Sequence, residues 1–255
     1  MTPLVLRTCG VRIDPVTMDE AVAAIRQAAA SREPLAVHLV NAYTLSLAVR
    51  DQTFREVVDR GALNLPDGMP LVWLGRRKGL VQLTDRVYGP DLTVAVCDQG
   101  RADGLRHYLY GGSPEVVERF AAALRRRFPG IELVGVESPP YRALTDDEEA
   151  QLVARIHASG ADVVWVGLGT PKQDLFVDRF ASRLSRPVIA VGAAFDFLAG
   201  AKRMAPRWVQ RAGLEWLYRL LSEPRRLWRR YLIGNLVFIF GALRTTRVEQ
   251  RRGPG

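Results

Sequence analysis

The sequence predicts an α/β fold in which a parallel β-sheet carries helices on both faces and a basic, amphipathic helical appendage follows at the carboxyl end. Short apolar runs alternate with helical patterns over the first 200 residues, as in sheets built from strand–helix–strand units. With 255 residues, 48% hydrophobic and 25% charged, the chain can also bury a sizeable core. We therefore expect an α/β domain over residues 1–200 and a helical appendage over residues 201–255.

The first 67 residues predict a hairpin, two helices and two strands. After the opening hairpin, Thr17 and Glu20 have the spacing of a capping box, so a helix should run from Thr17 to about residue 30. The apolar run 35–40 is typical of a buried strand, residues 44–61 of one helix, and residues 63–66 of a short strand. This last strand places Asp67 at a strand's carboxyl end.

Residues 107–191 predict four more strands separated by helices. Residues 107–110 form a strand that leads into a glycine turn, where Ser113 is placed to cap a helix with Pro114 in its first position. That helix should extend to about residue 128. Further strands are expected at residues 131–136, 161–167 and 187–191, and Thr145 opens another capping box with Glu148.

The appendage has a different character. Residues 208–221 show an amphipathic helical pattern that Pro224 interrupts, and a second helix should begin near Arg225. The apolar run 232–243 has 12 residues, which at a rise of ~1.5 Å cover about 18 Å, well short of the roughly 30 Å of a bilayer core. Its neighbouring aromatic residues and arginines are typical of the lipid headgroup region. We expect the appendage to lie in a membrane interface rather than to cross it.

The excess positive charge is confined to the carboxyl-terminal part of the chain. The formal net charge is +9, and residues 202–255 hold 13 arginines and lysines against three acids, so the rest of the chain is close to neutral. This asymmetry indicates that the appendage meets an anionic partner. A tail that binds nucleic acid would be equally basic. The apolar residues between the arginines favour an anionic membrane surface as the partner, and we expect no binding to nucleic acid.

The rest of the composition indicates a cytoplasmic protein without a structural metal. Residues 1–15 lack the apolar stretch and the small-residue cleavage site of a signal peptide, so we expect the protein to stay in the cytosol. Cys9 and Cys97 lie far in sequence from each other and from the histidines. This spacing predicts two packing residues and neither a disulfide nor a zinc site.

Two segments that follow expected strands are weak candidates for ligand binding, because turn amides and helix amino-termini converge at the carboxyl ends of parallel strands. The turn from Gly111 to Ser113 could hold a phosphate or be an ordinary turn with a helix cap. Asp67 precedes Gly68, and an isolated Asp-Gly pair is most often a simple turn.

A third segment, residues 167–174, has more of the features of a nucleotide site. Its two glycines allow the backbone to approach a ligand, and Lys172 and Gln173 supply polar contacts. The same residues also predict an ordinary strand–helix turn in which Thr170 caps the helix and Pro171 fills its first position.

The arginines of the appendage are candidates for binding a phosphate-rich ligand. Arg219, Arg226 and Arg229 would project from one side of a continuous helix, although Pro224 compromises that continuity. Guanidinium groups suit a diphosphate better than lysines do, but charged residues on an amphipathic helix most often form its solvated face. The residues we assign to the membrane surface are Trp208, Arg211, Trp216, Trp228 and Arg230.

A series of motifs follows in order along nearly the whole chain. They are VNA (40–42), PDG (66–68), YGPDL (88–92), GGSP (111–114), VGLGTPKQ (166–173), GAAFDFLAG (192–200), RMAP (203–206), GLEWLYRL (213–220) and EPRR (223–226). In this order they resemble the WecG/TagA/CpsF family of glycosyltransferases, also called glycosyltransferase family 26.

The resemblance implies a Rossmann-like fold and an inverting transfer of a sugar, often N-acetylmannosamine, from a UDP donor to N-acetylglucosamine on undecaprenyl diphosphate. It implies that Asp67 is the general base, that Asn41 belongs to the catalytic group, and that the appendage closes over the site at the membrane. Arg219, Arg226 and Arg229 would contact a diphosphate. The residues implied for the nucleotide sugar are Gly111, Ser113, Tyr141, Gly167, Gly169, Thr170, Pro171, Lys172, Gln173 and Asp196.

The chain departs from the family pattern at two positions, and the second bears on the donor sugar. Asp174 stands where many members have Glu, and Leu39 stands where many have Thr, which removes a hydroxyl near the expected site. The donor therefore stays open between UDP-N-acetylmannosamine and others such as UDP-glucose or UDP-N-acetylmannosaminuronate. The acceptor, the pathway (teichoic acid or another cell-wall or extracellular polysaccharide) and a homo-oligomeric state also stay open.

Inverting transfer needs a base and a means of stabilising the departing diphosphate. The chain has no Asp-x-Asp motif, so we expect catalysis without a metal or cofactor, with helix amino-termini and arginines neutralising the leaving group. A nicotinamide-dependent oxidoreductase of similar fold would require G-x-G-x-x-G after an early strand and an acid about 20 residues later. Neither is evident. We expect a peripheral enzyme on the inner face of the plasma membrane.

Overall fold

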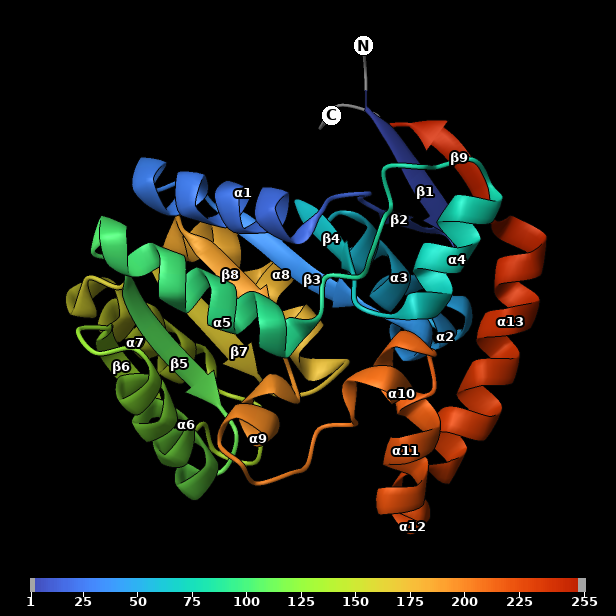
Figure 1. Cartoon of the computed structure of the whole chain (residues 1–255). Helices are drawn as coiled ribbons and strands as arrows, with labels where there is room; N and C mark the ends of the chain where they lie inside the picture. The colour runs from blue at the N-terminus through green and yellow to red at the C-terminus, as the bar shows by residue number, and fades with distance from the viewer. Residues whose placement is uncertain (1–2, 252–255) are drawn as a thin grey trace. The chain divides into compact units, whose positions relative to one another are not determined.

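The computed structural model describes residues 3–251 (Figure 1). The chain divides into two compact units. Unit 1 comprises Met1–Met18, Leu39–Tyr88 and Met204–Gly255, and unit 2 comprises Asp19–His38 and Gly89–Arg203. The division expected at residue 200 does not coincide with these units. The carboxyl-terminal helices belong to the same unit as the amino terminus, because the last strand pairs with the first and the last helix packs on α2.

A six-stranded parallel sheet of order β4-β3-β8-β7-β5-β6 organises the fold, which is therefore the expected α/β, Rossmann-like class (Figure 1). The strands are β3 (Leu35–Val40), β4 (Leu63–Pro66), β5 (Arg106–Gly111), β6 (Glu132–Glu137), β7 (Val163–Gly167) and β8 (Pro187–Ala190). Strand β3 pairs with β8 inside unit 2, and its last two residues belong to unit 1 with β4. Every expected strand is confirmed with small shifts at its ends.

Helices cover both faces of the sheet in unit 2. They are α1 (Met18–Ser31), α5 (Gly89–Gln99), α6 (Pro114–Arg127), α7 (Asp146–Ser159), α8 (Lys172–Leu184) and α9 (Ala194–Leu198), with a 3₁₀ turn at Gly100–Asp103. α7 and α8 pack on one face through a buried cluster that includes Ile156 and Phe180, and α1 and α5 lie on the opposite face (Figure 1). Apolar stripes on these helices thus bury the strands from both sides.

The helix caps in unit 2 follow the sequence signals with one exception. Ser113 Oγ accepts from the Val116 N–H at 3.3 Å, and Thr145 and Glu148 form the expected capping box. The expectation that Thr170 caps α8 is wrong. Pro171 occupies the cap position instead, without a side-chain cap bond, and the helix begins one residue later.

Unit 1 adds a small antiparallel sheet and a set of helices. The hairpin expected at the start consists of β1 (Leu4–Thr8) and β2 (Val11–Ile13), and β9 (Arg247–Gln250) pairs with β1 on its other edge. The helices are α2 (Ala42–Arg50), α3 (Gln52–Asp59), α4 (Met69–Arg77), α10 (Arg207–Arg211), α11 (Glu215–Ser222), α12 (Pro224–Trp228) and α13 (Gly234–Thr245), with a π-helical turn at Arg229–Ile233.

Two helices expected to be continuous are broken. The helix over residues 44–61 divides at Asp51, whose backbone is extended and whose Oδ1 accepts from the Phe54 N–H at 3.0 Å, so Asp51 ends α2 and caps α3. The helix over residues 208–221 divides at Gly213, which has a φ of +68°. A left-handed glycine ends a helix.

Helix α13 lies close against α2. A Cβ added at Gly241 would lie 2.9 Å from Val49 Cγ2 and 3.0 Å from Cys9 Sγ, so only glycine fits at this spacing. The outward side of α13 is apolar and exposed at Phe240 and Leu243. Within residues 3–251, no helix has both the length and the apolar character needed to span a bilayer.

Both cysteines are buried free thiols. Burial raises the pKa of Cys9 to about 11 and that of Cys97 to about 12, so both stay protonated at neutral pH. They are packing residues, as expected.

Candidate active site

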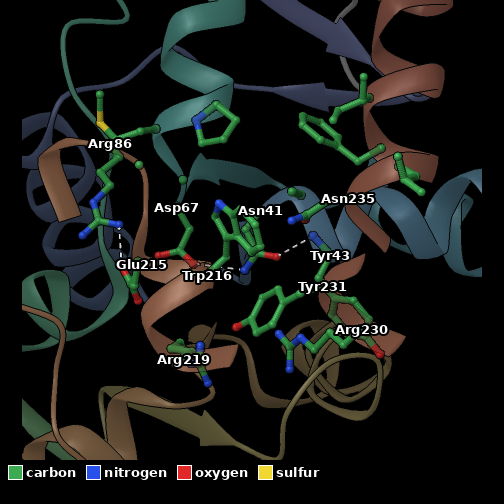
Figure 2. A pocket seen from close by; sticks show the side chains of 18 of the residues that line it. Asn41, Tyr43, Asp67, Arg86, Glu215, Trp216, Arg219, Arg230, Tyr231 and Asn235 are labelled. Atoms are coloured by element: carbon green, nitrogen blue, oxygen red, sulfur yellow. Dashed lines mark hydrogen bonds and ion pairs between the residues drawn. The ribbon is translucent and has the colours of Figure 1, made fainter. Parts of the chain in front are cut away.

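A cavity of about 580 Å³ lies within unit 1 (Figure 2). Three stretches of the chain line it: the start of α2, the turn from β4 into α4 together with Arg86, and the carboxyl-terminal helices from α11 to α13. Part of its wall is polar and charged, and part is aromatic and aliphatic.

Asp67 lies on the polar wall immediately after β4. Its backbone N–H donates to the Val40 carbonyl at 2.8 Å, which fixes the turn beside the end of β3. Asn41 Nδ2 donates to Asp67 Oδ2 at 3.1 Å. Asn41 Oδ1 accepts from the N–H groups of Tyr43 and Thr44 at 3.1 and 3.2 Å, and so caps α2. One side chain therefore orients the carboxylate and starts the helix beside it.

A largely buried ion pair also lines this wall. Arg86 Nη1 donates to Glu215 Oε2 at 2.9 Å, with the two side chains 11% and 15% exposed. Arg86 Nη2 donates to Gln210 Oε1 at 2.7 Å, and the Tyr88 hydroxyl donates to Glu215 Oε1 at 3.1 Å. Burial alone would lower the pKa of Arg86, but the hydrogen bond and charge of Glu215, with the charge of Asp67, raise it. The guanidinium therefore stays charged near the Asp67 carboxylate.

Two further arginines, Arg219 and Arg230, line the cavity (Figure 2). Burial lowers the pKa of Arg230, and the positive charge of Arg219 lowers it further. Within the described part of the chain, Arg230 has no carboxylate partner, and its Nε is buried without a hydrogen bond. Its guanidinium lies over the Tyr43 ring, 3.9 Å from the centroid.

Arg226 and Arg229, expected beside Arg219, do not line the cavity. Arg226 is exposed and pairs with Glu223, and Arg229 is exposed with its guanidinium 5.1 Å from the Trp228 ring centroid. The three arginines would share one side only on a continuous helix. The chain instead breaks at Glu223 and passes through the π-helical turn, and Arg230 is the residue of this segment that faces the cavity.

The apolar wall comes from α4, α11 and α13. Trp73 lies against Gly213, where an added Cβ would be 2.4 Å from the ring. The Trp216 and Tyr231 rings lie 6.3 Å apart, and Leu236 and Ile239 of α13 extend the wall. The cavity therefore has arginines on its polar wall and aromatic and aliphatic side chains on its apolar wall. Such a cavity suits an anion that also has an apolar portion.

The residues assigned to the membrane surface divide into two groups. Trp208 is 70% and Trp228 44% exposed, and Arg211 is exposed. Trp216 and Arg230, in contrast, face the cavity. Their different placement follows from the helix breaks, which turn parts of the segment inward.

In unit 2, the carboxyl ends of β5 and β7 approach closely because both end in glycine. A Cβ at Gly111, where φ is +144°, would lie 2.6 Å from the Gly167 carbonyl, and the Gly112 N–H donates to that carbonyl at 3.0 Å. A Cβ at Gly167 would meet the Phe195 ring at 2.6 Å. These glycines thus serve the packing of the strand ends, and Gly111 is buried.

The turn after β7 is held by Gln173. Its buried side chain accepts from the Gly169 N–H at 3.0 Å, and its Nε2 lies 3.5 Å from both Thr170 Oγ1 and the Ala190 carbonyl. Pro171 follows Thr170 through a cis peptide bond. Gln173 therefore shapes the turn from within.

Other residues expected to hold the nucleotide sugar are accessible in unit 2. Tyr141 is fully exposed, and the Lys172 ammonium lies 5.0 Å from its ring centroid. Asp196 pairs with Lys202 at 3.3 Å, and Ser113 is an exposed helix cap.

Sequence reasoning missed several residues of the cavity, among them Tyr43, Arg86 and Glu215. Glu215 did carry a signal, because it is one of only three acids among the 13 basic residues from position 202 onward. Arg86 and Tyr43 gave none, since their partners are remote in sequence. No group of three His, Cys, Asp or Glu side chains suited to a metal ion occurs in residues 3–251.

Comparison with known proteins gives a family match over nearly the whole chain. The model described as the glycosyl transferase WecG/TagA/CpsF family matches residues 6–252. This match includes the cavity of unit 1 and the strand ends of unit 2. It confirms the family predicted from the ordered motifs.

Proposed function

The chain belongs to the WecG/TagA/CpsF family of glycosyltransferases, and from this premise we propose that it transfers a sugar from a UDP donor to a polyprenyl-diphosphate-linked saccharide with inversion and without a metal ion. Membership makes the chain a glycosyltransferase and implies a role in cell-wall polysaccharide synthesis. The proposed donor carries N-acetylmannosamine or a related hexose, with UDP-glucose and UDP-N-acetylmannosaminuronate as alternatives. The proposed acceptor is N-acetylglucosamine on undecaprenyl diphosphate.

One observation supports this proposal above all others: the cavity of unit 1 combines an oriented carboxylate, several arginines and an apolar wall. A lipid diphosphate bearing a sugar has the matching parts, namely a hydroxyl to be deprotonated, an anionic diphosphate and an apolar tail. An acceptor without a lipid would leave the wall formed by Trp73, Leu236 and Ile239 uncovered.

In the proposed reaction, the acceptor hydroxyl loses its proton to the Asp67 carboxylate as its oxygen attacks the anomeric carbon. A carbon–oxygen bond forms there, the bond to the UDP phosphate breaks on the opposite side, and UDP leaves with the electron pair. Asn41 orients the Asp67 carboxylate by donating to its Oδ2 at 3.1 Å. Arg219 supplies positive charge for the departing diphosphate, which supports a mechanism that needs no metal.

For the nucleotide, we propose the accessible residues at the strand ends of unit 2. Tyr141 offers an exposed ring on which a base can stack, and Lys172 beside it offers a charge for phosphate. Gly167 and Gly169 belong to the turn that Gln173 holds in shape.

We propose that the protein works on the inner face of the plasma membrane. The exposed Trp208, Trp228 and Arg211 suit the headgroup region, and the outward apolar side of α13 suits the acyl boundary. Binding of the purified protein to vesicles with anionic lipid, but not to neutral vesicles, would support this placement.

UDP release by the purified protein tests the reaction. The assay uses a short-chain lipid diphosphate bearing N-acetylglucosamine and a panel of UDP-sugars. Release that depends on the acceptor and on one sugar would name the donor. Asp67→Asn keeps the size and the bond from Asn41 but removes the base, so we expect a loss of about 100-fold or more in kcat. A folded Asp67→Asn variant with unchanged kcat would contradict the role of Asp67.

A further inference from the structure

Arg230 is a partly buried cation that has no carboxylate partner in the part of the chain that the structure describes. Its Nε is buried without a hydrogen-bond partner, and no carboxylate among residues 3–251 forms an ion pair with it. The nearby charges of Arg219 and Arg226 are also positive. A partly buried guanidinium without an anionic partner costs stability, so packing of the folded chain alone gives no reason for a cation at this position.

The guanidinium of Arg230 is held in place by aromatic rings rather than by carboxylates. It stacks over Tyr43 at 3.9 Å and lies 5.7 Å from the ring of Tyr231. Stacking of this kind positions a guanidinium plane while leaving its N–H groups free to donate at the edge. Figure 2 shows Arg230 and Tyr43 among the side chains that line the cavity.

Tyr43 also connects this cation to the carboxylate on the polar wall. It lies in the first turn of α2, and its N–H donates to Asn41 Oδ1 at 3.1 Å. The other end of the Asn41 amide donates to Asp67. The start of α2 therefore sets the position of the carboxylate through Asn41 and that of the buried cation through the Tyr43 ring.

We infer that Tyr43 and Arg230 form the seat for the diphosphate of a lipid diphosphate, with Arg230 contacting the phosphate oxygens and Tyr43 positioning Arg230. A diphosphate brings the negative charge that the site lacks, and its oxygens accept from the edge of the guanidinium. The apolar wall that includes Leu236 and Ile239 favours a lipid diphosphate over a nucleotide diphosphate. The inference rests on the proposed function, because it assigns one part of the proposed acceptor.

Direct binding tests this seat without relying on catalysis. The probes are geranyl diphosphate and UDP, titrated by calorimetry into the full-length protein. The variants are Arg230→Met, the matched control Arg225→Met on exposed α12, Tyr43→Phe, which keeps the ring, and Tyr43→Leu, which removes it. Arg230→Met loses a charge-assisted contact to the diphosphate, so its affinity for geranyl diphosphate should fall about 10- to 100-fold. Tyr43→Leu should lower the affinity for geranyl diphosphate by a smaller factor. Arg225→Met and Tyr43→Phe should bind geranyl diphosphate as wild type does.

Stability distinguishes a ligand seat from a structural role. Removing a partly buried charge that has no anionic partner should leave the urea midpoint of Arg230→Met unchanged or raise it, whereas loss of a residue that stabilises the fold would lower the midpoint. A lowered urea midpoint of Arg230→Met would overturn the inference. So would a wild type that does not bind geranyl diphosphate, or an Arg230→Met variant that binds it as tightly as wild type does. Weaker binding of UDP alone in Arg230→Met would overturn it as well. A wild type that binds geranyl diphosphate through Arg230 but transfers no sugar would instead count against the proposed reaction.

Discussion

Replacing Glu215 by Gln should destabilise unit 1, because it leaves Arg86 charged and buried without its anionic partner. Glu215 accepts hydrogen bonds from Arg86 at 2.9 Å and from the Tyr88 hydroxyl at 3.1 Å. Glutamine preserves the volume and one acceptor oxygen but removes the charge. The remaining partner of Arg86, Gln210, is neutral.

The size of the loss follows from the burial of the pair. Removing one partner of a fully buried ion pair costs about 3–5 kcal/mol. Here the Arg86 and Glu215 side chains are 11% and 15% exposed, and the glutamine amide oxygen can still accept a hydrogen bond. We therefore expect the free energy of unfolding to fall by about 2–3 kcal/mol. Adding Arg86→Met to Glu215→Gln should recover part of it, since the double variant no longer buries an unpaired charge.

Urea unfolding followed by tryptophan fluorescence measures this loss. Four of the five tryptophans, Trp73, Trp208, Trp216 and Trp228, belong to unit 1, so the signal reports mainly on that unit. Glu115→Gln provides the matched control, because the Arg119–Glu115 pair is 50% and 79% exposed and should contribute about 0.5 kcal/mol or less. If Glu215→Gln also lost no more than the control, the reasoning from burial would be refuted.

Two further predictions concern pH and packing in unit 1. Burial, with the charges of Glu215 and Asp67, raises the pKa of Tyr88. Above about pH 10 the unfolded chain therefore loses the Tyr88 proton more readily than the folded chain does, and the free energy of unfolding falls as the pH rises. Tyr88→Phe lacks the hydrogen bond to Glu215 and should be less stable than wild type at pH 7 by about 1 kcal/mol. Because only the wild type has this tyrosine to ionise, urea titrations at about pH 11 should show a smaller difference in stability, and an unchanged difference would contradict the raised pKa. Gly241→Leu should cost about 1–3 kcal/mol in urea unfolding, because its side chain would collide with Val49 and Cys9, and a stability equal to wild type would show that α13 can move away from α2.

Much of the fold could be predicted because its signals are local. The six strands follow from short apolar runs, and the caps at Ser113 and Thr145 from residues a few positions apart. The same local reasoning placed Asp67 at the end of a strand. The prediction of one helix over residues 44–61 failed because two local signals compete there. The apolar pattern continues through Asp51, but the Asp51 side chain caps a new helix.

The pairing of β9 with β1 lay beyond local reasoning, since the two strands are at opposite ends of the chain. For the same reason the appendage could not be assigned to a unit with the amino terminus. Hydrogen bonds between strands depend on which segments the whole fold brings together, and nothing in residues 247–250 alone identifies the partner.

The sequence by itself determined the α/β class, the family and the carboxylate at a strand end. Only the tertiary structure decided which charges of the basic segment line the cavity. Helical spacing predicted Arg226 and Arg229 beside Arg219, yet Arg230 is the one of the three arginines 226, 229 and 230 that lines the cavity, over Tyr43. The reason is physical: the environment of a charge is set by every element packed around it, including a helix nearly two hundred residues earlier, whereas periodicity extends over only a few turns.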